Sequence, residues 1–251
     1  MDERGWADAP DSPVVWRPAG QEPTAFGVTR DVVMATMGGR AGAFGGTAGP
    51  AVVEAIDREI AAAGRWLDDC FVLALRLPLS SAGGAKRSSV EGLGVLAGPP
   101  GTFDGAGSVY VLLATAGAEL EAEVTSRFAR GEVVGGMALD AVGTVLVGLL
   151  VERFLDEAER EVPIGLSLQP GCHHLPMVFQ KRIFTLLGAE CYGMAITDSL
   201  MLRPTKSVTS VVPAGKDLVV RRGRVPLCDL CSMRERCQYR VFEHLDGGGH
   251  R

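Results

Sequence analysis

The amino-acid sequence predicts an α+β fold with a mainly antiparallel, twisted sheet and packed helices. The chain has 251 residues and is 47% hydrophobic, which is enough apolar material to bury a substantial core. Short apolar runs of strand length alternate irregularly with stretches of helical character. No regular strand–helix–strand unit repeats along the chain, and this mixed order favours an antiparallel sheet over a doubly wound parallel one.

The predicted strands are short apolar runs suited to burial in a sheet, over residues 70–77, 92–97, 108–115, 192–197 and 207–212. Apolar residues at helical spacing predict a helix over residues 51–69. Further helices are expected over residues 118–130, 133–161 and 178–187, and Pro163 ends the second of these. Residues 167–176 are rich in turn-forming residues and are expected to form a loop.

Composition divides the chain into three parts. Residues 1–25 are rich in proline, aspartate and glycine without periodicity, and are expected to be a flexible N-terminal tail. Residues 26–225 hold the α+β domain. Residues 226–251 form a C-terminal segment that contains a cluster of cysteines.

Charge and hydropathy exclude several classes of partner. The formal net charge of −5 gives no general attraction to nucleic acid or to an anionic membrane. The N-terminus lacks the basic start and the apolar stretch of a secretory signal. The most apolar run, residues 141–151, is shorter than the roughly 18 residues of a membrane-spanning helix. We therefore expect a cytoplasmic protein, in which the six cysteines need a role other than disulfide formation.

Polar and turn-forming residues gather in two blocks of the C-terminal half. Pro170 and Gly171 predict a tight turn whose backbone lets a ligand approach closely. Thr197, Asp198 and Ser199 at a strand end offer several hydrogen-bonding groups, in a position where loops commonly form sites. Each block alone also fits an ordinary turn or an ordinary helix cap.

Three ordered blocks resemble the activation domain of cobalamin-dependent methionine synthase. That family has a Pro-Gly-Tyr loop before a helix, then a Leu-Thr-Glu-Ser strand end and a Pro-x-x-Ser-Val segment. The matching residues here are Pro170, Gly171, Thr197, Ser199, Pro204, Ser207 and Val208, with Asp198 in place of the glutamate. Residues 115–120 and 140–143 extend the resemblance more weakly, so that it covers roughly the C-terminal half.

The resemblance implies the fold above and a role with a corrinoid. Family domains support the reduction and remethylation of the corrinoid cobalt. The implied partner is therefore a separate corrinoid-binding protein or cobalamin-dependent methyltransferase, together with an electron-donor protein. The resemblance and the loop arguments give one candidate set of cofactor-binding residues: Asp140, Pro170, Gly171, Cys172, Thr197, Asp198 and Ser199.

Two departures bear on S-adenosylmethionine. The family's ligand loop begins with an arginine and ends with a tyrosine, and this sequence has Ser167 and Cys172 there. The guanidinium group that would pair with the ligand's carboxylate is absent, which puts S-adenosylmethionine binding in doubt. The fold and the corrinoid-related role depend less on these two residues.

Asp140 lies inside a strongly apolar helix. A carboxylate there needs a partner or a cavity, because burial of a lone charge is costly. It is either a site residue or a structural hydrogen-bonding group for nearby backbone. Glycines in the same helix predict close contact with another element. These are Gly135, Gly136, Gly143 and Gly148.

Cys228, Cys231 and Cys237 form the strongest chemical signal outside the resemblance. Two thiolates three residues apart bind one metal centre in zinc and iron–sulfur sites. At about 100° per residue a straight helix would turn Cys237 away from Cys228, so a loop followed by a helix is expected. Cys172 is the expected fourth ligand. Spacing alone fits a 4Fe–4S cluster, a zinc ion or three unligated thiols, and the resemblance favours the 4Fe–4S cluster.

The function expected from these observations is reductive activation or repair of a corrinoid protein or methyltransferase through an iron–sulfur cluster. The first alternative is a non-catalytic module that binds a corrinoid protein and carries a structural zinc site. The second is reductive methylation of cobalamin that depends on S-adenosylmethionine. Whether the chain is itself an enzyme, as a redox activator, stays open at this point.

Overall fold

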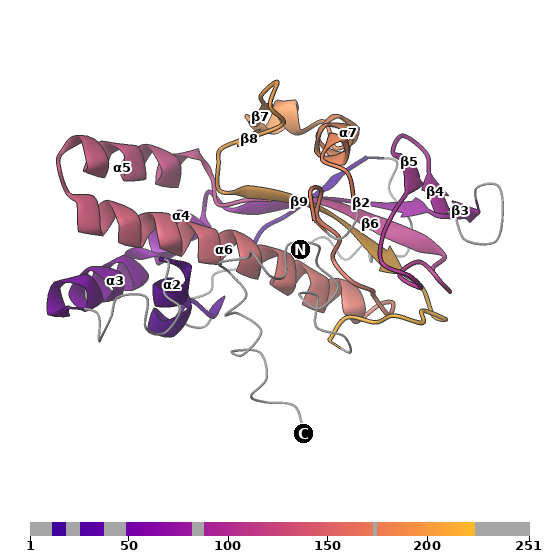
Figure 1. Cartoon of the computed structure of the whole chain (residues 1–251), viewed down its shortest axis with the longest axis horizontal. Coiled ribbons are helices and arrows are strands. Elements are labelled where there is room, and N and C mark those ends of the chain that lie inside the picture. The colour runs from indigo at the N-terminus through magenta and orange to yellow at the C-terminus, as the bar shows by residue number, and fades with distance from the viewer. Residues whose placement is uncertain (1–11, 19–25, 38–48, 82–87, 173–174, 224–251) are drawn as a thin grey trace.

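The computed structural model describes residues 12–18, 26–37, 49–81, 88–172 and 175–223 (Figure 1). Its centre is a four-stranded antiparallel sheet in the order β1 (Val14–Trp16), β2 (Phe71–Pro78), β6 (Ser108–Thr115) and β9 (Ser207–Ala214). The pairings of β2 with β6 and of β6 with β9 each run over all eight residues. The predicted α+β fold with a mainly antiparallel sheet is confirmed.

Helices cover one face of the sheet. They are α2 (Arg30–Thr36), α3 (Pro50–Ala62), α4 (Gly64–Leu67), α5 (Ala118–Ala129) and α6 (Val133–Glu159). Alternate strand residues such as Val72, Tyr110 and Val212 join these helices in one buried cluster. Because the strands alternate sides, their other residues are left for the opposite face.

The opposite face is covered by α7 (Val178–Leu186), the 3₁₀ helix η1 (Ala189–Tyr192) and two small sheets. One sheet contains β3 (Ser80–Ser81), β4 (Ser88–Val90) and β5 (Gly94–Leu96), and the other contains β7 (Ala195–Ile196) and β8 (Leu202–Arg203). Leu73, Val111 and Val211 point into a second buried cluster on this side. A sheet buried on both faces explains why β2 and β6 read as continuous apolar runs.

Helix α6 is long and apolar enough to cross a membrane by length and composition alone, which the short run at residues 141–151 did not indicate. In this fold 56% of its most apolar window is buried. The sheet side of α6 contributes Leu139, Leu146 and Phe154 to the first core cluster. A mostly buried core helix passes the same test, so this one helix is weak evidence for a membrane span.

Three sequence predictions need correction. Residues 14–16, placed within a flexible tail, pair with β2 as an edge strand, and the Trp16 side chain is buried in the core. The helix predicted over residues 51–69 is divided at Ala63 into α3 and α4. The strand predicted over residues 192–197 shortens to β7 and follows η1, because Gly193 adopts a left-handed conformation (φ 76°) that ends the preceding turn.

Candidate functional site

The segment that leads into β9 joins three parts of the chain that resembled the methionine synthase domain. The Lys206 Nζ donates hydrogen bonds to Asp140 Oδ2 and to Thr144 Oγ1, each at 2.9 Å. The Ser207 hydroxyl lies 2.8 Å from Thr115 Oγ1. The blocks around residues 115–120, 140–143 and 204–208 therefore meet at one place, although up to 92 residues separate the bonded pairs.

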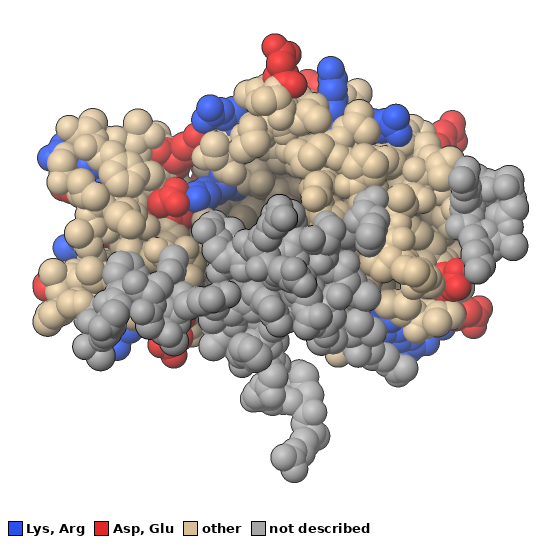
Figure 2. Space-filling model, viewed as in Figure 1, with Lys and Arg blue, Asp and Glu red and all other residues tan. Residues whose placement is uncertain are grey.

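Glu121 of α5 holds the same segment from the other side. Its carboxylate accepts hydrogen bonds from Arg203 Nη1 at 3.0 Å and from the Thr205 backbone N–H at 2.7 Å. Figure 2 shows acidic and basic side chains side by side between α5 and the β7–β8 hairpin, next to a hollow in the surface. The approach to β9 is thus fixed by charges on both helices of the α5–α6 pair.

A carboxylate in an apolar helix needs a partner, and Asp140 has one. This partner is the Lys206 side chain rather than a backbone group. The Asp140 side chain is 47% exposed and the Lys206 side chain 19% exposed. Gly143, one turn later, permits this contact: a Cβ there would lie 2.7 Å from Leu120 Cδ2 and 3.2 Å from Lys206 Cγ. The close approach predicted for the glycines of this helix is confirmed at Gly143, and also at Gly136, where a Cβ would lie 3.0 Å from Phe128 Cε1. It is wrong at Gly148, where a Cβ would meet nothing within 4 Å.

The predicted turn at Pro170 and Gly171 is present. The Cys172 N–H donates to the Gln169 carbonyl oxygen at 3.0 Å, and Gly171 has φ +83°, as the third residue of a type II turn requires. Pro170 is buried, Gly171 is exposed and Cys172 is partly exposed. A Cβ on Gly171 would lie 2.5 Å from Met177 Sδ, so the side chain that approaches this backbone closely belongs to Met177.

Thr197, Asp198 and Ser199 form the turn between β7 and β8. Thr197 Oγ1 lies 2.9 Å from Ser199 Oγ and accepts the Met201 N–H at 3.0 Å, so the threonine hydroxyl stabilises the turn itself. Asp198 and Ser199 are exposed. Within the described part of the chain Asp198 has no hydrogen bond or ion pair, which leaves its carboxylate open to solvent or a partner.

The first turn of α7 contacts both of these turns. Met177 lies against Gly171, and the Gln180 amide donates to the Leu200 carbonyl oxygen, one residue after Ser199. Gln180 also accepts a hydrogen bond from the Thr209 hydroxyl of β9 at 3.4 Å. The two turns therefore lie on the α7 side of the sheet, whereas Asp140 lies on the α6 side with Lys206. That all seven candidate residues line one cofactor site stays a prediction.

Exposed apolar side chains surround the α7 side. Met177 is 39% exposed, Tyr192 39% and Met201 52%. They come from the residue that caps the start of α7, from η1 and from the β7–β8 turn, next to Gly171 and Ser199. A surface of this kind, apolar with exposed polar groups, suits contact with another macromolecule.

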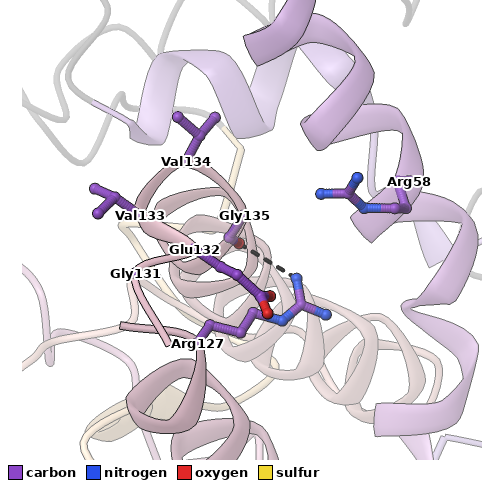
Figure 3. A pocket seen from close by; sticks show the side chains of 7 residues that line it. All are labelled: Arg58, Arg127, Gly131, Glu132, Val133, Val134 and Gly135. Atoms are coloured by element: carbon purple, nitrogen blue, oxygen red, sulfur yellow. Dashed lines mark hydrogen bonds between the residues drawn. The ribbon is translucent and has the colours of Figure 1, made fainter. Parts of the chain in front are cut away.

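A pocket of about 430 Å³ lies elsewhere, at the tip of the α5–α6 hairpin (Figure 3). Arg58 of α3 faces it from one side, and Arg127, Glu132 and the first turn of α6 from the other. Below it Glu59, a fully buried residue, pairs with Arg127 Nη1 at 2.5 Å and with Arg58 Nε at 3.2 Å. Burial acts to lower the pKa of Arg127, but the hydrogen bonds that its guanidinium donates to Glu59 and Glu123 outweigh this effect and keep the pKa raised.

Cys228, Cys231 and Cys237 lie outside the described residues, so their predicted convergence is not tested. Among the residues that the structure describes, no three histidine, cysteine, aspartate or glutamate side chains are grouped to hold a metal ion. Cys70 is buried and Cys191 is exposed. Burial raises the pKa of the Cys70 thiol to about 12, so this residue is a core side chain rather than a thiolate ligand.

No protein-family model and no curated protein sequence matches this chain. Among solved structures, the MetH reactivation domain bound to AdoHcy superposes with a TM-score of 0.53 at 13% sequence identity. The match covers 86% of this chain and 84% of that one. This chain has the fold of the MetH reactivation domain.

At 13% identity the similarity to the MetH reactivation domain establishes a shared fold. The ligand of that domain does not transfer with the fold. Ser167, which stands where the methionine synthase family has its loop arginine, has a buried hydroxyl that lacks a hydrogen-bond partner among the described residues. A buried hydroxyl of this kind offers no charge for a ligand carboxylate.

The sequence pointed to Asp140 but not to the side chains that hold its surroundings together. Lys206, Glu121 and Arg203 were missed there, and Gln180 was missed on the α7 side. Lys206 stands inside the Pro-x-x-Ser-Val segment, next to a matched serine, and this position was the only available signal. Its partner lies 66 residues away, a separation that no local pattern reveals.

Proposed function

We propose that this chain activates a corrinoid protein by supporting the reduction of its cobalt. The observation that carries the proposal is the fold shared with the MetH reactivation domain over most of both chains. The motif residues add support, because Pro204 and Ser207 lie in one hydrogen-bonded group with Thr115. The activity itself depends on a corrinoid-bearing partner protein.

The α7 side is the proposed contact surface for that partner. The exposed Met177, Tyr192 and Met201 supply apolar area, while Asp198 and Ser199 supply polar groups at its edge. A corrinoid presents a broad apolar ring edged with amides, which such a mixed surface complements. On this proposal the turns at residues 170–172 and 197–199 face the corrinoid.

The proposed cofactor is a 4Fe–4S cluster held by Cys228, Cys231, Cys237 and Cys172, with zinc as the alternative. Cys172 fits a ligand role in being partly exposed at a turn held by backbone hydrogen bonds. A bound cluster would supply single electrons at low potential. The residues of the chain would then hold the partner's corrinoid near Cys172, and an electron-donor protein would complete the cycle in the cytoplasm.

The test begins with anaerobic purification of the full chain, followed by iron and zinc analysis and an absorption spectrum. We expect a brown protein with about four irons per chain, and Cys231→Ser should lose both iron and colour. Cys191→Ser is the matched control, since Cys191 is exposed and outside the proposed ligand set. Retention of iron and spectrum by Cys231→Ser would show that the cluster assignment is wrong.

The functional arm uses a methionine synthase corrinoid-binding domain loaded with cob(II)alamin as the probe. With dithionite-reduced chain, we expect loss of the cob(II)alamin electron paramagnetic resonance signal and growth of cob(I)alamin absorption. Dithionite with the Cys231→Ser variant corrects for direct chemical reduction. A colourless chain with one zinc that binds the probe without reducing it would make the chain a binding module. No effect and no binding would refute the proposed function.

Calorimetric titration with AdoHcy addresses reductive methylation separately. Because Ser167 replaces the arginine, we expect no binding at concentrations that saturate a domain with that arginine. Tight AdoHcy binding by this chain would favour methyl transfer from S-adenosylmethionine instead.

A further inference from the structure

Leu200, in the turn between β7 and β8, has a backbone conformation that an ordinary side chain disfavours. Its φ is +66°, and in the part of the chain that the structure describes it is the one residue other than glycine with a positive φ. In this left-handed region the Cβ of an L-residue lies too close to the following carbonyl oxygen. Such a conformation persists only where the surrounding structure holds it. The turn at residues 197–201 therefore needs a restraint.

Hydrogen bonds inside the turn supply part of this restraint. The Leu200 N–H donates to the Thr197 carbonyl oxygen, and the Thr197 N–H donates to the Met201 carbonyl oxygen, each at 2.9 Å. These bonds close the turn, but all their partners lie within it, so they do not attach it to the sheet. Among the described residues, the two buried clusters do not include the Leu200 side chain, and core packing therefore does not fix this residue.

Gln180 of α7 attaches the turn to the sheet. Its Nε2 donates to the carbonyl oxygen of Leu200, the strained residue itself. Its Oε1 accepts a hydrogen bond from Thr209 Oγ1 at 3.4 Å, and Thr209 is a fully buried residue of β9. A carboxamide has one donor end and one acceptor end. The bond from Thr209 therefore directs the NH₂ group of Gln180 towards the turn.

The turn that Gln180 restrains carries exposed polar groups of the α7 side. Asp198 and Ser199 directly precede Leu200, and both are exposed. We propose that Gln180 is a positioning residue, which holds the turn so that Asp198 and Ser199 meet the corrinoid partner without a change of backbone conformation. This inference rests on the proposed function, in which the turn faces the corrinoid. A surface fixed before binding loses less conformational entropy on association, so Gln180 contributes to partner affinity through the turn.

The test uses the full chain with Gln180→Met, which keeps the length of the side chain and removes both hydrogen bonds. Hydrogen exchange followed by mass spectrometry reports on the turn itself. Its amides, at residues 197–201, should exchange about fivefold faster in the variant, as the net loss of roughly one hydrogen bond predicts. With the cob(II)alamin-loaded probe, the concentration for half-maximal reduction should also rise about fivefold. The maximal rate should stay unchanged, because the variant loses docking rather than electron transfer.

Arg182→Met is the matched control. Arg182 lies on the same helix and donates to the Leu93 carbonyl oxygen at 2.7 Å, but it points about 200° around the helix from Gln180. This variant should leave both the exchange of the turn and the half-maximal probe concentration unchanged. The double variant Gln180→Met/Leu200→Asn should recover part of the lost affinity, because asparagine adopts the left-handed region more readily than leucine. A general loss of stability in α7 would not be reversed at Leu200.

Three results would overturn the positioning role. These are unchanged exchange of the turn in Gln180→Met, an unchanged half-maximal probe concentration in that variant, and a lack of recovery with Leu200→Asn. If the unaltered chain neither binds nor reduces the probe, the proposed corrinoid function fails instead. The exchange measurement needs no partner, so it still decides whether Gln180 holds the turn.

Discussion

At the scale of single residues, the contact between Asp140 and Lys206 links α6 to the start of β9. Lys206 is 19% exposed and Asp140 47% exposed, so the pair is partly screened by solvent. In a double-mutant cycle with Asp140→Ala and Lys206→Met we expect a coupling free energy of about 0.5–1 kcal/mol, decreasing at high salt. Urea unfolding of the variants measures this coupling free energy.

The Arg30–Asp57 pair is more exposed and serves as the control, which should show a smaller coupling free energy. Equal coupling in the two pairs would contradict the role given to Lys206.

Cys70 gives a prediction about pH. Burial first, and then nearby Asp69, raise the pKa of its thiol from 9.0 to about 12. Since the folded state holds the proton more tightly than the unfolded state, this contribution to stability is complete below pH 9 and is lost as the pH rises towards 12. At pH ~8 a thiol reagent should label the exposed Cys191 in the native chain, and Cys70 only after unfolding. Labelling followed by peptide mass spectrometry shows which thiol reacts, and rapid native labelling of Cys70 would contradict its burial.

At the scale of elements, α6 contains two glycines in opposite surroundings. A Cβ on Gly143 would lie 2.7 Å from Leu120 Cδ2, whereas a Cβ on Gly148 would meet nothing within 4 Å. Gly143→Ala should therefore lower the free energy of unfolding by roughly 1–3 kcal/mol through overpacking against α5. Gly148→Ala should raise it by up to about 1 kcal/mol, because alanine favours the helix. Urea titrations of the two variants give the comparison, and a stabilising Gly143→Ala would show that α5 and α6 pack less closely than described.

The same helix shows what sequence could and could not predict. Its existence and its end before Pro163 followed from apolar content and proline, and the close approach at Gly143 followed from the glycine itself. The partner of Asp140 could not be predicted, since Lys206 is distant in sequence and surface lysines are common. Trp16 and its edge strand were missed because three residues carry too little periodic signal, and the pairing with β2 decides their structure.

At the scale of the whole molecule, one sheet separates two groups of candidate site residues. The α6 side holds Asp140 with its partner Lys206, and the α7 side holds the turns at residues 170–172 and 197–199. The resemblance implies that Asp140 and both turns lie around one ligand, and this stays a prediction. The order of matched blocks along the chain does not by itself determine on which face of a sheet each block lies, because strand residues alternate between faces.

The boundary between the folded domain and the C-terminal segment leads to a further prediction. Among the described residues, both core clusters lie between Trp16 and Val220. Arg222 is anchored on α6 by ion pairs with Asp156 at 2.7 Å and Glu159 at 3.4 Å, and its N–H donates to the Ile164 carbonyl oxygen at 3.0 Å. A chain ending at residue 223 therefore keeps the core and this anchor, and should unfold cooperatively with a melting temperature within a few degrees (~5 °C) of the full chain.

The truncated chain lacks Cys228, Cys231 and Cys237, so it should bind neither iron nor zinc after anaerobic purification. Calorimetry and metal analysis of the two chains test both statements. The full chain with all three of these cysteines changed to serine is the matched control, because it removes the ligands and keeps the segment. Metal retained by the truncated chain would move the site onto residues 1–223. Loss of cooperative unfolding in the truncated chain alone would instead make residues 224–251 part of the folded core, and the proposed three-part division would be wrong.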